Sequence, residues 1–276
     1  MSRFWNKLVA HKSGLIGFII VSIVIVAGIA APLLSPFDPF AIDMDNSLQA
    51  PSFTHPFGTD FFGRDLLSRL VYGARISLIV GVLSRIIAVA LGTVLGLVAG
   101  YFGGRVDGII MRLADVTLAY PGLLLLIAVM AVVGPSMVSL FIALGIVGWA
   151  GVARVIRAQV LSLREREYVL AIKSLGASSP VILFRHLLPN CVSQLLVVFS
   201  MGLGMAIMAE SSLSFLGLGA QPPAPSWGSM ISSGLSYLRV NPWLSLAPGL
   251  VITITVLGFN LLGDALRDLL DPKLGK

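Results

Sequence analysis

Only a few side chains in this sequence could do chemistry in an apolar setting, and they are far apart. The carboxylates Asp115, Glu210 and Asp264 lie beside the ends of long apolar runs, and Arg85 lies inside one. Deep, paired carboxylates would indicate a proton-coupled carrier, because a charged group within a membrane is costly and usually functional. All three carboxylates are expected near an interface, where a capping or hydrogen-bonding role suits them better. A stand-alone, ion-coupled secondary transporter therefore remains the alternative interpretation.

Arg85 has two interpretations that the residues alone leave open. A long arginine close to a helix end can extend its guanidinium to the headgroups while its stem stays in the apolar layer. An arginine inside a span can instead line a path for a polar solute or pair with a carboxylate. We therefore carry Arg85 and Glu210 forward as candidate residues of a translocation path.

Metal and cofactor chemistry find no support in the pattern of residues. The histidines His11, His55 and His186 are scattered, and neither an HExxH motif nor a Cys/His cluster occurs. The single cysteine, Cys191, begins an apolar run and is expected to be a small buried side chain. No GxxxxGK[ST] phosphate loop is present. We expect no catalytic residue, metal or cofactor in this chain, so any ATP that drives its work must bind to another polypeptide.

The composition places these residues in a membrane protein. Of 276 residues, 57% are hydrophobic and only 12% are charged, and the mean hydropathy is +0.95. Soluble domains carry about 25% charged residues. The elements that position the charged side chains are therefore expected to be transmembrane helices.

Apolar runs long enough for a span, which needs about 20 residues, recur along the chain. The charge-free run from Val116 to Ala153 is too long for one span, and Gly134 and Pro135 supply a turn that divides it. The sequence predicts an all-α integral membrane protein with a single transmembrane domain over residues 1–276. The six expected spans are about 14–34, 79–102, 114–133, 137–155, 191–211 and 244–263.

The segments on the outer side of these spans are expected to be partly ordered. Residues 36–74 and 212–242 are rich in proline, glycine and aromatic side chains. The stretch that follows Asp65 has the apolar spacing of a helix, and it could form an interfacial helix that leads into the second span.

The basic residues predict the orientation. If both termini are inside, fourteen of the 19 lysines and arginines fall in inner segments and four in outer ones, Arg85 being the remaining one. Inner loops of membrane proteins carry this excess of basic residues. The sequence therefore predicts an N-in, C-in topology. The inner basic residues at the two ends of the chain are Arg3, Lys7, Lys12, Arg267, Lys273 and Lys276.

Four glycines, Gly92, Gly96, Gly100 and Gly104, recur at intervals of four residues along the second span. Residues four apart share one helix face, and glycines on that face let another helix approach closely. The pattern predicts a helix-packing strip, and a direct role in lining a substrate path is the alternative.

A charged, amphipathic insert separates the fourth and fifth spans, over about residues 156–190. Gly176 suits the left-handed position that ends a helix, and Ser179 followed by Pro180 is typical of an N-cap and first helical position. The insert, most clearly over residues 163–190, predicts a short helix, a glycine turn and a second helix at the membrane surface.

The first helix of this insert has a surface suited to docking against another protein. Its apolar side chains are Tyr168, Leu170, Ala171, Ile172 and Leu175, while the neighbouring arginines, glutamates and Lys173 stay polar. An amphipathic helix can also rest on lipid headgroups. The small residues Ala171, Gly176 and Ala177 favour docking, since lipid anchoring asks for bulk.

This insert resembles the EAA loop of ABC-importer permeases, whose pattern is EAA, three residues, Gly, nine residues, then I-x-L-P. Aligning Gly176 places residues 170–172 at EAA and Pro189 at the final proline. Leu170, Ile172 and His186 depart from the pattern. The form EYVLA-x-x-x-LGAS is typical of the peptide/nickel importer permeases, C-type subunit. The segments HPFGTDFFGRDLLSRLVYGARISL, GGRVDGIIMRLADVTLAYPGLLL, SFLGLGAQPPAPSWGSMI and FNLLGDALRDLLDPKL resemble that family as well.

The resemblance implies a type I ABC-importer permease fold and the function of a transmembrane subunit in an ATP-driven importer. The importer would move di- or oligopeptides, or a related small solute, across the bacterial plasma (inner) membrane. The implied partners are a homologous B-type permease, one or two ATPase subunits that bind ATP and Mg²⁺, and an extracytoplasmic solute-binding protein. The residues implied in ATPase docking are Glu167, Tyr168, Leu170, Ala171, Lys173, Leu175, Gly176, Ala177 and Pro189.

Overall fold

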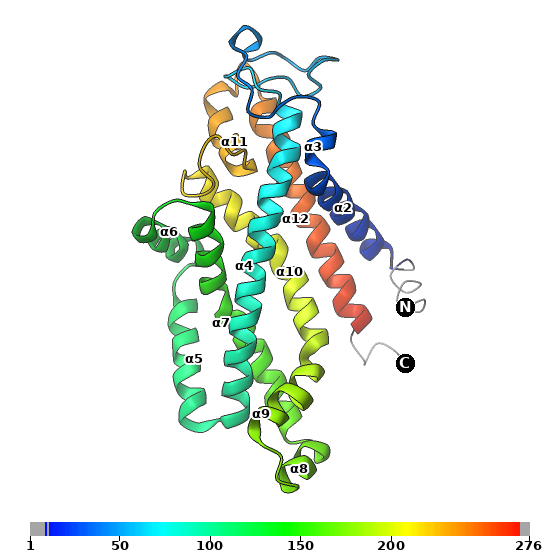
Figure 1. The fold of residues 1–276 in the computed structure, drawn as a ribbon, viewed down its shortest axis with the longest axis vertical. Coiled ribbons are helices and arrows are strands. Elements are labelled where there is room, and N and C mark those ends of the chain that lie inside the picture. Colours follow the sequence, from blue (N-terminus) through cyan, green and yellow to red (C-terminus); the bar gives the residue numbers. More distant parts are fainter. Residues whose placement is uncertain (1–8, 10, 271–276) are drawn as a thin grey trace.

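The computed structural model describes residue 9 and residues 11–270, and within this part it contains helices and loops but no β-strand. The terminal basic residues Arg3, Lys7, Lys273 and Lys276 lie outside the described residues. Long helices run along the main axis of the molecule, with loops and α11 at one end and α8 at the other (Figure 1). The helices are α2 (Lys12–Ile29), α3 (Ala31–Leu34), α4 (Leu66–Phe102), α5 (Gly104–Ala119), α6 (Gly122–Val133), α7 (Met137–Arg164), α8 (Glu167–Ser174), α9 (Ser179–Val181), α10 (Leu188–Phe215), α11 (Trp227–Gly234) and α12 (Trp243–Leu270).

Five helices in the described part are long and apolar enough to cross a membrane, and a sixth crossing requires α5 and α6 to be counted together. These two helices meet at an angle of 93°. The span predicted over about 114–133 therefore contains a sharp bend between α5 and α6. Pro121 has no N–H to donate and disfavours helical backbone at the residue before it, and Tyr120 is extended, with φ −93° and ψ 142°.

The second span is part of a much longer helix than predicted. Helix α4 has 37 residues, or about 55 Å at the usual rise per residue. The helix predicted after Asp65 forms, and it continues without a break into the second span. The Asp65 carboxylate caps the α4 N-terminus by accepting from the Ser68 backbone N–H at 2.8 Å.

The outer end is ordered by side-chain contacts to α4. His55 Nδ1 lies 2.8 Å from an Asp65 carboxylate oxygen, and Arg69 donates to the Pro39 carbonyl at 2.9 Å. The indole of the fully buried Trp227 donates to the Leu70 carbonyl at 2.9 Å. These bonds hold the loop before α4 and helix α11 against the top of the same helix.

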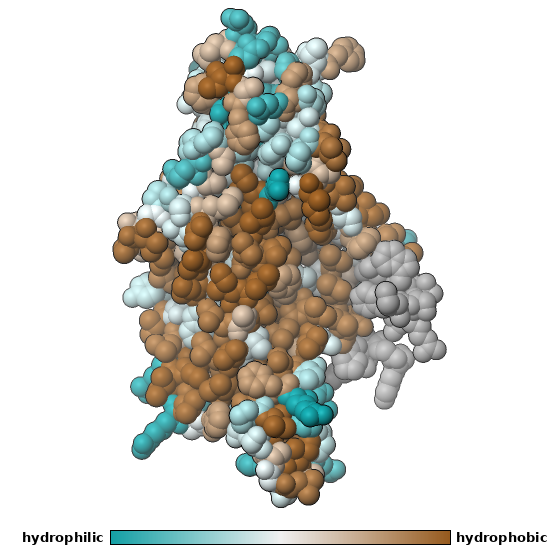
Figure 2. All heavy atoms as spheres, viewed as in Figure 1, coloured by the Kyte–Doolittle hydropathy of each residue, from teal (hydrophilic) through white to brown (hydrophobic). Residues whose placement is uncertain are grey.

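Two helix groups form the interior. Helices α4 and α7 make the most extensive contact, and α12 packs between α2 and α10. Gly134 takes φ +91° in the turn between α6 and α7 that the sequence predicted. In the space-filling view apolar side chains cover most of the middle of the visible face, and hydrophilic side chains gather toward its two ends (Figure 2). This distribution matches a protein whose middle lies in lipid.

Candidate functional site

The insert between α7 and α10 folds into a short helical hairpin at the inner end of the molecule. Helix α8 ends at Ser174, and Gly176 takes φ +83°, the left-handed conformation expected for it. The chain then re-enters a helix whose N-cap is Ser178. The predicted N-cap, Ser179, is therefore wrong by one residue, and Pro180 occupies the second helical position.

The prediction of a second surface helix in the insert, separate from the fifth span, is wrong. From Ser179 the chain forms one continuous helical segment of 37 residues that ends at Phe215 and includes the fifth span. Its first part contains a π-helical stretch, Ile182–Leu187. Pro189 removes an N–H from the ladder and crowds the preceding turn, and a local change to π-helical spacing is a common response to such an interruption. Pro189 thus lies within a helix rather than in a docking loop.

Helix α8 is anchored by its inner face and exposed on its outer face. Val169 is 2% exposed and belongs to an apolar cluster with residues of α4, α7 and α10, against which Ile172 also packs. On the outer face Leu175 is 87% exposed and Leu170 is 51% exposed. The outer face of this anchored helix is therefore an exposed apolar surface.

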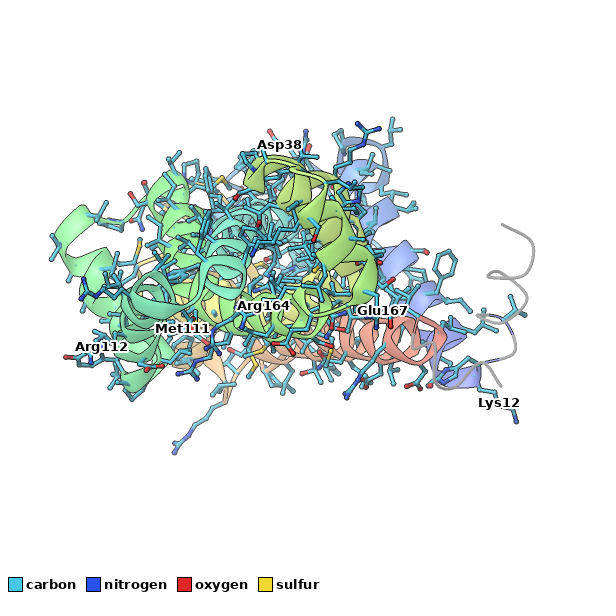
Figure 3. The ribbon with its side chains drawn as sticks, turned by 90° about the horizontal axis from the view of Figure 1, so that it is seen from below. Lys12, Asp38, Met111, Arg112, Arg164 and Glu167 are labelled. Carbon is cyan, nitrogen blue, oxygen red and sulfur yellow. The ribbon has the colours of Figure 1, made fainter. Side chains whose placement is uncertain are left out.

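The other candidate docking residues divide between these two faces. Glu167, Tyr168, Ala171, Lys173 and Gly176 are exposed. Ala177 packs against the inner cluster instead. Viewed from below, Arg164 lies over the middle of the bundle and Glu167 lies farther toward α12, while Lys12 and Arg112 lie near opposite edges (Figure 3).

The hairpin is tied to the spans by arginines that the sequence did not single out. Arg164 donates to the Gly100 carbonyl at 2.9 Å, so the end of α7 is fixed to the end of α4. Arg157 binds Asp107 through two nitrogens, each 2.5 Å from a carboxylate oxygen. Such two-pronged pairs fix geometry as well as charge. These basic side chains therefore join α7, whose last residue is Arg164, to α4 and α5 at the inner end of the molecule.

The glycine strip packs against α7 over three of its four positions. An added Cβ would lie 2.5 Å from Val152 at Gly92, 2.6 Å from the Ala153 carbonyl oxygen at Gly96, and 2.8 Å from Val160 at Gly100. Gly104 begins α5 with φ +53° and has open space around it, so its assignment to the strip is wrong. The helix ends at Phe102, which removes Gly104 from that face.

Arg85 points across the bundle rather than outward to headgroups. Its guanidinium donates to the Val198 carbonyl at 2.8 Å and lies against Gly202, both on α10. The Arg85 Nε is buried and has no partner among the described residues. The outward-extended interpretation is therefore wrong, and Arg85 joins α4 to α10.

Glu210 is fully buried among the helices of the chain, and it has the hydrogen-bonding role that the sequence favoured. Its carboxylate accepts from Ser77 at 2.9 Å, from Ser214 at 2.7 Å and from Ser211 at 3.4 Å. Hydroxyl donors of this kind satisfy a carboxylate without a paired charge. Glu210 thus joins α10 to α4 within this chain rather than facing a path.

The other carboxylates near the membrane are exposed. Asp115 pairs with Arg154 at 2.5 Å and Asp264 is solvent-accessible. In the part of the chain that the structure describes, no group of three His, Cys, Asp or Glu side chains is placed to hold a metal ion.

Family models match both parts of the chain. Residues 92–276 match the model of the binding-protein-dependent transport system inner membrane component. Residues 1–51 match the N-terminal TM domain of oligopeptide transport permease C.

Curated relatives match nearly the whole chain. A dipeptide transport system permease protein, DppC, from Alkalihalophilus pseudofirmus is 44% identical over 98% of this chain and 89% of its own length. A glutathione transport system permease protein, GsiD, from Pectobacterium atrosepticum is 44% identical, with coverage of 99% and 91%. The oligopeptide transport system permease protein OppC from Bacillus subtilis is 42% identical, with coverage of 97% and 88%.

The fold matches a solved transporter. A chain of the inward-facing MetNI methionine ABC transporter aligns with a TM-score of 0.59 and 17% identity, covering 74% of this chain and 97% of that one. This likeness concerns the fold, and the family rests on the sequence matches. The chain belongs to the family of binding-protein-dependent transport system inner membrane components, and it is a multi-pass transmembrane subunit of an ATP-driven importer in the bacterial inner membrane.

Proposed function

We propose that the importer containing this chain carries dipeptides or longer peptides, and that α8 couples the spans to an ATPase subunit. The substrate class is supported by the names of the relatives, which include dipeptide and oligopeptide permeases as well as a glutathione permease. All three names describe small peptides or peptide-like molecules with amide bonds.

The coupling role rests on the contrast between the buried inner face and the exposed outer face of α8. Val169 on the inner face is enclosed by α4, α7 and α10, whereas Leu170 and Leu175 on the outer face have no cover within the described chain. A helix held in this way moves together with the spans. A partner that grips the outer face therefore transmits its own movement to them.

The proposed assembly has two homologous permeases, this chain and a B-type subunit, which enclose the path between them. Two ATPase subunits bind at the inner end, and ATP-driven closure between them shifts α8 as a lever. A solute-binding protein delivers peptide to the outer end. ATP and the peptide-loaded binding protein would each shift the balance between two states of the assembly. Coupling between distant sites requires such a shared equilibrium.

The alternative of a gradient-driven carrier has less support from the site. Glu210, the carboxylate enclosed within the spans of the described chain, is met by serines and by no second carboxylate. A proton relay needs neighbouring groups that exchange a proton.

Purification of the tagged chain from native membranes in mild detergent, followed by mass spectrometry, tests the proposed assembly. We expect to recover a second permease, one or two ATPases and a peptide-binding protein, with untagged membranes as the control. A chain that is recovered alone and transports peptide without ATP would contradict the proposal.

A further inference from the structure

One groove of the molecule exposes polar and sulfur-containing side chains at the depth of the membrane. It lies between α10 and α12, which pack side by side. Thr253 and Asn260 of α12 are both exposed, and each lies ten residues from an end of that helix. At about 1.5 Å per residue both belong to the central part of the span, within the hydrocarbon layer of about 30 Å.

Polar side chains recur along one exposed face of α12. Thr253, Asn260 and Asp264 are spaced by seven and four residues, so they share one helix face. This polar face adjoins α10, because Asn260 lies beside Gly204 of that helix. Leu250, Ile254 and Leu257 of the same helix are also exposed and are apolar.

A matching stripe runs along α10. Met201, Met205, Met208 and Ser212 are spaced by four, three and four residues, again one helix face. Met205 is 75% exposed and Met208 is 59% exposed. Gln194 continues the stripe toward the inner end and is also exposed. Met201 adjoins Gly263 of α12, which places the two stripes next to each other.

A pocket opens at the outer part of this groove. It has a volume of about 350 Å³, and its walls include Met208, Ser212 and Phe215 of α10 and Ile252 of α12, together with Ile231 of α11 and Leu123 of α6. A volume of this order accommodates a small ligand or part of a larger one. The groove thus has both a polar wall and an adaptable apolar recess.

Lipid is a poor occupant of this groove. The side-chain amides of Asn260 and Gln194 form no hydrogen bond with any residue that the structure describes, and an unsatisfied amide in hydrocarbon is costly. Water and molecules with amide bonds can form the hydrogen bonds that these side-chain amides lack. Methionine is flexible and polarizable, and it suits surfaces that receive many different apolar side chains.

We infer that the groove between α10 and α12 is the part of the translocation path where this chain contacts the transported peptide. The polar side chains of Thr253, Asn260 and Gln194 bind the peptide backbone. The methionine stripe and the pocket beside Met208 receive its side chains. This inference rests on the proposed function, and it replaces Arg85 and Glu210, which the structure places within the packing of this chain.

Paired cysteine variants test the inference in vesicles that contain the complete importer with its binding protein and ATP. Thr253→Cys is compared with Ile254→Cys, and Gln194→Cys with Leu196→Cys, since each pair lies at one depth but on different faces of the helix. Cys191 stays in place because it is buried. The probe is a membrane-impermeant trimethylammonium methanethiosulfonate, which reacts with thiolates, and a thiolate forms only where water reaches it.

We expect the two groove positions to be modified at least about tenfold faster than their partners, because water reaches a path and not the lipid layer. Alanyl-alanine, supplied during turnover, should slow the modification at the groove positions alone. If either groove variant fails to assemble, Met205→Cys takes its place as the groove position in the comparison. Equal rates within both pairs, or groove rates that the peptide leaves unchanged, would overturn the inference.

Uptake of alanyl-alanine by the parent importer is measured in the same vesicles. Uptake that is independent of ATP, or that is absent both for alanyl-alanine and for a longer alanine peptide, contradicts the proposed function itself. Normal ATP-dependent uptake with no difference between the paired positions contradicts only the placement of the path in this groove.

Discussion

Replacing Gly176 with Asp or Glu is expected to abolish peptide uptake while the chain remains inserted in the membrane. Gly176 has φ +83°, and a non-glycine residue in the left-handed region costs about 1–2 kcal/mol. No other atom lies within 4 Å of an added Cβ, so the change leaves the interior intact. It places a negative charge and a distorted turn beside the exposed Leu175, on the proposed ATPase-docking surface. Uptake and membrane abundance, measured together, check this expectation.

Gly104 provides a matched control for this variant. It also has a positive φ, +53°, and open space around an added Cβ, but it lies between α4 and α5 rather than on the hairpin. Gly104→Asp should keep uptake within about twofold of the parent, as is usual for a change on an open surface. Unchanged uptake in Gly176→Asp, or an equal loss in both variants, would count against docking at this turn.

Replacing Gly96 with Leu is expected to prevent stable folding. An added Cβ would lie 2.6 Å from the Ala153 carbonyl oxygen and 2.9 Å from Ile156 Cβ, so the obstacle includes backbone of α7. Overpacking typically costs 1–3 kcal/mol, and we expect about 3 kcal/mol or more where a backbone atom cannot yield. The measurement is thermal unfolding of the purified importer in detergent, together with its yield.

Gly151→Leu is the matched control, since Gly151 belongs to α7 and an added Cβ there meets no atom within 4 Å. It should unfold at nearly the temperature of the parent. A Gly96→Leu importer as stable as the parent would show that α4 and α7 are not packed as closely as described.

Sequence alone predicted the features that depend on local chemistry. The turn at Gly176 follows from the need for a left-handed residue after a helix, and the packing of Gly92, Gly96 and Gly100 follows from their spacing on one face. The two departures within these motifs are Gly104 and Ser179. Both lie at helix ends, whose positions depend on the flanking contacts.

The features that failed depend on contacts between segments distant in the sequence. Glu210 lies where its apolar run ends, but the sequence did not show that Ser77, 133 residues away, donates a hydrogen bond to it. Arg85 looked free to extend outward, but the Val198 carbonyl of α10 receives its guanidinium. The bend at Pro121 was hidden because apolar residues continue through it, and hydropathy carries no information on helix direction. The α10–α12 groove required knowledge of which faces remain uncovered after packing.

The coupling of α8 to an ATPase is tested most directly by a photo-crosslink from its outer face. Benzoylphenylalanine replaces Leu175, which is 87% exposed, and in a second variant it replaces Ile109 of α5, which is 63% exposed. Illumination of membranes that contain the assembled importer should join the Leu175 variant to an ATPase subunit, with little product from the Ile109 variant. No ATPase adduct from Leu175, or equal adducts from both positions, would contradict the account.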